Sequence, residues 1–164
     1  MLSWSDFLDA VPKVELHCHI AGAVRATTLH EIATKNGVAL PRPAETLYQW
    51  KDFYGFLEVL RLGALAVQKR EDFERVAYEC IEDMHRHGNA RHVEIFFNPH
   101  YYAPNGATYE VIVAGLAAGL ERAERDFGVS SLMIACIDRS VCLPSEALEM
   151  LDWIEGRATG HCTD

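Results

Sequence analysis

Apolar and polar residues alternate in three short stretches of the chain, a pattern typical of β-strands that bury one face. The predicted strands are Lys13 to His19, Arg91 to Asn98 and Ser131 to Asp138. Between and around them, apolar residues recur at helical spacing. The predicted helices are a short amphipathic start over Trp4 to Ala10, then Ala26 to Asn36, Glu71 to Arg86, Thr108 to Phe127 and Ser145 to Ile154. Strands and helices in alternation indicate an α/β fold.

Glycines and polar residues mark the predicted ends of these elements. Gly37, Gly88 and Gly128 follow predicted helices, at the position where glycine commonly ends a helix. The stretch Tyr101 to Ala107 is predicted to be a loop between the second strand and the next helix. The polar tail Gly156 to Asp164 is also predicted to be a loop.

His17 and His19 are the candidate metal ligands. Side chains two residues apart on a strand point to the same side, so both imidazoles can bind one cation. The intervening pattern predicts that Val14, Leu16 and Cys18 face an apolar layer. A histidine pair of this spacing is weak evidence by itself, because most such pairs are surface or core residues. Gly22, which turns the chain towards a helix, strengthens the interpretation.

Four blocks of sequence occur in a distinctive order. They are Pro-Lys-Val-Glu-Leu-His-Cys-His at 12–19 followed by Gly22, Arg25, Thr28 and Leu29, then Phe56-Leu57 followed by 71–79, then Val-Glu-Ile-Phe-Phe-Asn-Pro-His at 93–100, then Ile-Asp-Arg-Ser at 137–140. In this order they resemble the adenosine deaminase family of metal-dependent aminohydrolases. The resemblance extends over nearly the whole chain and implies the N-terminal part of a (β/α)₈ TIM barrel.

The length of the chain sets a limit on that fold. A (β/α)₈ barrel usually needs about 250 residues and about eight strand-helix units. This chain has 164 residues, and its pattern gives roughly three such units. We therefore predict one domain over residues 1–164, an incomplete TIM barrel that contains only the N-terminal strands and helices. A helical insertion is expected around residues 44–67.

The resemblance implies hydrolytic deamination of a purine, either adenosine, adenine or a modified nucleoside. One Zn²⁺ would lower the pKa of a bound water, which attacks the carbon that carries the amine and releases ammonia. His17 and His19 would hold the metal. The third histidine, the proton-shuttling glutamate and the metal-binding aspartate belong to later strands in the family, so the catalytic residues stay unassigned. His161 and Asp164 only faintly resemble that later block, and we expect the chain by itself to be weakly active or inactive.

The substrate pocket is predicted from the same resemblance. The candidate contacts are His19, Ala21, Phe53, Phe56, Leu57 and Leu60. The four insertion residues either cover a flat purine or form the core of the insertion, and both can hold. Ala21 stands where the family usually has an acidic residue that contacts a sugar hydroxyl. The missing acceptor favours adenine, or a nucleoside with an apolar substituent, over adenosine.

The amino-acid composition limits which kinds of molecule the chain is expected to bind and where it is expected to occur. Apolar residues make up 49% of the chain and charged residues 24%, as in an ordinary globular domain. The formal net charge of −9 argues against nucleic acid as a partner. No stretch is long enough to span a bilayer, and the start lacks a secretory signal. Five cysteines without C-x-x-C spacing suggest reduced thiols in the cytoplasm.

Two alternatives stay open. The first is a non-catalytic half-barrel that associates with itself or with another chain through its open sheet edges. The second is a phosphoesterase of another barrel family that also begins with a histidine pair. Phe56-Leu57 and the strand at 93–99 favour the aminohydrolase.

Overall fold

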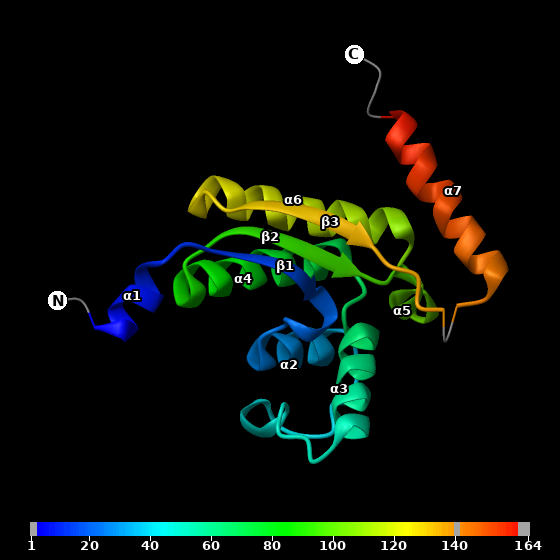
Figure 1. The fold of residues 1–164 in the computed structure, drawn as a ribbon. Helices are drawn as coiled ribbons and strands as arrows, with labels where there is room; N and C mark the ends of the chain where they lie inside the picture. The colour runs from blue at the N-terminus through cyan, green and yellow to red at the C-terminus, as the bar shows by residue number, and fades with distance from the viewer. Residues whose placement is uncertain (1–2, 140–141, 161–164) are drawn as a thin grey trace.

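The computed structural model describes residues 3–139 and 142–160, and an open sheet of three parallel strands lies at its centre (Figure 1). The strands are β1 (Lys13–His19), β2 (Ala90–Phe97) and β3 (Ser130–Ala135), in the order β1-β2-β3. The predicted α/β fold is confirmed. The third strand is shorter than predicted, because its neighbour β2 ends at Phe97 and Pro99 then begins a helix.

Helices connect and cover the strands. They are α1 (Trp4–Ala10), α2 (Ala26–Lys35), α3 (Phe53–Ala66), α4 (Arg70–Gly88), α5 (Pro99–Tyr102), α6 (Tyr109–Phe127) and α7 (Pro144–Gly160), with 3-10 turns η1 (Ile20–Gly22), η2 (Ala44–Thr46) and η3 (Ala103–Asn105). The predicted cap of α6 is present: the Thr108 hydroxyl accepts a hydrogen bond from the N–H of Val111. Gly128 follows α6 with a φ of 67°, the left-handed conformation that glycine adopts without strain.

Two predicted loops are wrong. The stretch Tyr101 to Ala107 is largely helical, because Pro99 at the first helical position has a φ suited to a helix and needs no hydrogen-bond donor there. The tail is also helical as far as Gly160, since one interior glycine costs a helix only about 1 kcal/mol and no proline follows. His161 and Asp164 lie outside the described residues.

The main core lies between the sheet and the pair α4 and α6. Val93 and Ile95 of β2 are fully buried there. The two helices approach closely because α6 has a glycine at the contact: a Cβ atom on Gly115 would lie 2.5 Å from the backbone oxygen of Arg70. These helices cover one face of the sheet (Figure 1). The exposed ring of His17 stacks on Phe96 at the opposite face.

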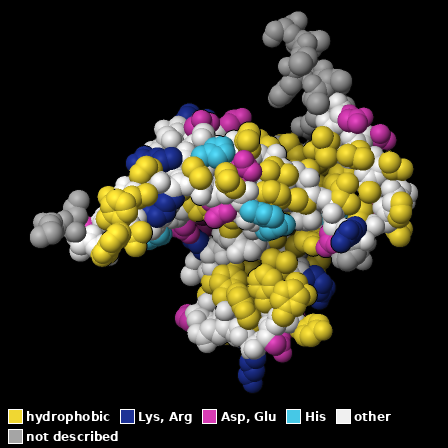
Figure 2. Space-filling model, viewed as in Figure 1, with side chains coloured by type: hydrophobic (Ala, Val, Ile, Leu, Met, Phe, Trp, Pro, Cys, Tyr) yellow, Lys and Arg dark blue, Asp and Glu magenta, His cyan; other side chains and the backbone are white. Residues whose placement is uncertain are grey.

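Cys18 is half-buried against the core, as predicted, but the predicted burial of Val14 and Leu16 is wrong. Their side chains are 61% and 55% exposed. The reason is that β1 is an edge strand, whereas α4 and α6 pack against β2 and β3. Figure 2 shows further hydrophobic side chains gathered over α1, over the segment that leads into α3, and over α7. None of the described helices is both long and apolar enough to cross a membrane.

Candidate active site

The imidazoles of His17 and His19 converge near the C-terminal end of β1. Their Nε2 atoms lie 3.2 Å apart, and their ring centroids 5.1 Å. Two Nε2 lone pairs at that distance repel each other unless a proton or a cation lies between them. For a Zn–N length of about 2.05 Å, nitrogens 3.2 Å apart subtend about 103° at the metal, near the tetrahedral angle of about 109°. The pair therefore fits two positions of a tetrahedral zinc site.

Among the described residues, no third histidine, cysteine, aspartate or glutamate groups with these two as a possible ligand. A catalytic zinc site typically has three protein ligands and one open position for water. His17 and His19 are both exposed, so further ligands can approach them from the open face of the sheet.

A cavity of about 250 Å³ opens beside His19. It brings together four of the predicted substrate residues, His19, Ala21, Phe56 and Leu60. Phe53 and Leu57 do not line it, and their side chains are 66% and 39% exposed, although the Phe53 ring centroid lies 6.0 Å from that of Phe56. The rest of the lining is Gly22, Phe96, Phe97, Asn98 and Tyr101.

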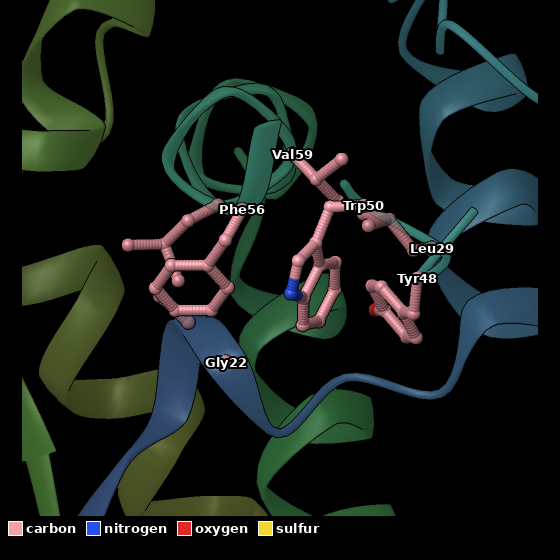
Figure 3. Close-up of a pocket in the computed structure, with 8 residues that line it drawn as sticks. Gly22, Leu29, Tyr48, Trp50, Phe56 and Val59 are labelled. Atoms are coloured by element: carbon pink, nitrogen blue, oxygen red, sulfur yellow. The ribbon is translucent and has the colours of Figure 1, made fainter. Parts of the chain in front are cut away.

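A smaller apolar cavity of about 100 Å³ lies next to the first (Figure 3). It shares Phe56, Leu60 and the η1 turn with the larger cavity, and Leu29, Tyr48, Trp50 and Val59 complete its wall. The Trp50 and Phe56 rings meet edge to face with centroids 5.1 Å apart. Sequence reasoning missed Tyr48 and Trp50, although the abundance of aromatic residues in the insertion was the available signal.

Polar groups gather where β2 and β3 end. The Tyr101 hydroxyl donates to Asp138 at 2.6 Å. Burial, and then the Asp138 carboxylate, raises the pKa of Tyr101 to about 12, so the phenol stays protonated at neutral pH. Burial lowers the pKa of His100, and neither ring nitrogen has a hydrogen-bond partner in the described part of the chain. The cavity thus has an apolar wall from α3 and a polar rim at the sheet.

The family model for adenosine deaminase matches residues 12–156, almost the whole chain. The chain belongs to the adenosine deaminase family. This confirms the predicted resemblance. The chain is 35% identical over 167 residues to an adenine deaminase of Gibberella zeae, an alignment that covers 96% of this chain and 46% of that protein.

Solved structures of the family share the fold. An adenine deaminase from Arthrobacter aurescens matches with a TM-score of 0.81 and 33% identity, over 91% of this chain and 46% of that one. An amidohydrolase from Burkholderia ambifaria, solved with bound Zn, matches with a TM-score of 0.82 and 35% identity, over 95% and 44%. An Arabidopsis structure complexed with GMP, at 22% identity and a TM-score of 0.68, shows the fold alone. The chain spans less than half the length of these proteins, so its open sheet corresponds to about half of a TIM barrel.

Proposed function

We propose that this chain supplies two metal ligands and part of the substrate pocket of a zinc-dependent aminohydrolase that releases ammonia from a purine. The 3.2 Å separation of the His17 and His19 Nε2 atoms, beside a cavity of about 250 Å³, carries the proposal. Family membership supports hydrolytic deamination, and the relative solved with Zn supports that metal.

The residues present have distinct parts in this chemistry. When bound, one Zn²⁺ supplies a water whose pKa lies near neutral. His17 and His19 hold the metal through neutral Nε2 atoms. Phe56 and Leu60 of α3 close one side of the cavity with apolar surface, which brackets a flat base and excludes bulk water from the reacting carbon.

Adenine is the proposed substrate. The relatives named adenine deaminase support the free base. Ala21 lies in the wall of the cavity, and its methyl group offers no acceptor for a sugar hydroxyl. A ribose hydroxyl buried there without a partner would cost binding free energy.

Titration of the purified chain with Zn²⁺ tests the proposal. We expect His17→Ala and His19→Ala each to weaken Zn²⁺ binding by at least about 10-fold, because each variant leaves only one of the two imidazoles. His87→Ala, at an exposed position in the last turn of α4, is the matched control and should bind Zn²⁺ like the wild type. Unchanged Zn²⁺ affinity in both site variants would contradict the proposal. Ammonia release from adenine should be slow or absent in the 164-residue chain, because its described residues provide no third ligand.

Self-association is a second candidate role. The exposed edge of β1, with Val14 and Leu16 uncovered, favours pairing with another chain. Sedimentation analysis should show a dimer or larger species that Leu16→Lys converts to monomer. The phosphoesterase alternative loses its support, because the family shown is adenosine deaminase.

A further inference from the structure

We propose that Glu15 is a positioning residue for His17, because it holds β1 in a bulge that turns the two imidazoles towards one point. The inference rests on the proposed function of His17 and His19 as metal ligands. It assigns a role to a carboxylate that does not line the cavity and does not group with the two histidines as a further metal ligand among the described residues.

The pairing of the strands reveals the bulge. Glu15 pairs with Val93, and Cys18 pairs with Ile95, so three steps along β1 match two steps along β2. One extra residue therefore lies in β1 at the start of the histidine pair. A bulge of this kind bends its strand and changes the direction in which a side chain points.

The direction in which each histidine leaves the strand affects how closely the imidazoles converge. In a regular strand, residues two apart lie about 6.6 Å from each other, and their side chains stand side by side. The Nε2 atoms of His17 and His19 lie only 3.2 Å apart. The two rings therefore lean towards each other, and the bulge in β1 contributes to this by changing the direction of the side chains that leave it.

Glu15 bonds to the backbone inside this distortion. Its Oε1 accepts a hydrogen bond from the backbone N–H of His17 at 2.9 Å. The side chain thus forms a hydrogen-bonded ring with the backbone two positions later. A carboxylate accepts such a bond more strongly than a neutral oxygen does. The bond fixes the peptide before His17, while the Phe96 ring fixes the imidazole itself. Groups that orient a metal ligand without touching the metal commonly change metal affinity by about 10- to 100-fold.

Two variants of Glu15 separate positioning from general stability. Glu15→Gln keeps an oxygen that can accept the His17 N–H, whereas Glu15→Met keeps the length of the side chain and loses that acceptor. Glu94→Met is the matched control, since Glu94 lies on neighbouring β2 and its carboxylate is 3.9 Å from His92 Nε2. Urea unfolding midpoints of the metal-free proteins, expected to be close to wild type in all three, exclude simple loss of fold.

Two readouts test the proposal. Amide hydrogen exchange of His17 in the metal-free chain should be about 10-fold faster in Glu15→Met, and near wild type in Glu15→Gln and Glu94→Met. Titration with Co²⁺, followed by its visible spectrum, should show affinity reduced about 10-fold or more in Glu15→Met and within about 3-fold of wild type in the other two. Wild-type exchange and affinity in Glu15→Met would overturn the inference. If the wild type binds no Co²⁺, the proposed function fails, and the exchange data still decide whether Glu15 holds His17.

Discussion

The imidazole of His17 stacks on the phenyl ring of Phe96, with centroids 4.1 Å apart and the ring planes within 18° of parallel. The two residues come from the neighbouring strands β1 and β2, and Phe96 pairs with His19 in the sheet. One aromatic ring therefore supports both candidate ligands, since the His19 centroid is 5.5 Å away. The orientation of the two imidazoles therefore depends on the pairing of β1 with β2, which places Phe96 beside them.

Replacing Phe96 by leucine removes this flat support. We expect the Phe96→Leu chain to bind Co²⁺ about 10-fold more weakly, because the His17 ring gains freedom to turn. Phe73→Leu is the control, because Phe73 is buried on α4 and does not line the cavity beside His19. The control should lower the free energy of unfolding by roughly 1–2 kcal/mol and change metal affinity less. Equal metal affinity in wild type and Phe96→Leu would contradict this prediction.

Ala21 provides a test of substrate choice. We expect Ala21→Asp to strengthen binding of adenosine relative to adenine by about 10-fold, because a carboxylate supplies the acceptor that a sugar hydroxyl needs. Equilibrium dialysis of both compounds with the zinc-loaded chain measures the ratio. Ala103→Asp, at an exposed position on η3, adds the same charge away from the cavity lining and should leave the ratio unchanged. The idea fails if both variants shift the ratio alike.

A charge cluster attaches the segment after η1 to α4, and it predicts a dependence of stability on pH. Arg25 Nε donates to Asp83 at 2.8 Å, and Arg25 Nη2 donates to Glu82 at 2.8 Å. The hydrogen bond from Arg25 lowers the pKa of Asp83 below its ordinary value of 3.8. A carboxyl group with a lowered pKa stabilises the fold above its ordinary pKa, and this stabilisation is lost as the pH falls through the lowered value.

We therefore expect Asp83→Asn to lower the free energy of unfolding near neutral pH by roughly 0.5–1 kcal/mol, a small effect because the pair is partly exposed. The difference from wild type should vanish as the pH is lowered below 3.8 and through the shifted pKa. Urea unfolding at a series of pH values measures both effects. Asp9→Asn, an exposed aspartate of α1, is the control and should follow the wild type throughout. A constant difference at every pH would show that Asp83 acts through packing alone.

Much of the fold could be predicted from local sequence patterns. The alternation of apolar and polar residues predicted the ends of β1 and β2 to within one residue. The Thr108 cap and Gly128 predicted the two ends of α6. Such signals depend on residues close together in the chain. Two errors occurred where a neighbouring element decides: β3 ends early because β2 stops, and Val14 is exposed because α4 and α6 pack mainly against β2 and β3.

The candidate site also combines features that the sequence predicts with features that only the tertiary structure decides. Sequence spacing alone determined that His17 and His19 lie on one strand with their side chains on one side, since a strand repeats every two residues. Only the tertiary structure showed that their Nε2 atoms lie 3.2 Å apart, beside a bulge in the pairing with β2 and with the His17 ring stacked on Phe96. It also decided that Phe56 and Leu60, rather than Phe53 and Leu57, face the cavity. Helical spacing places all four residues on one side of α3, but the docking of α3 against η1 and α2 decides which of them line the cavity.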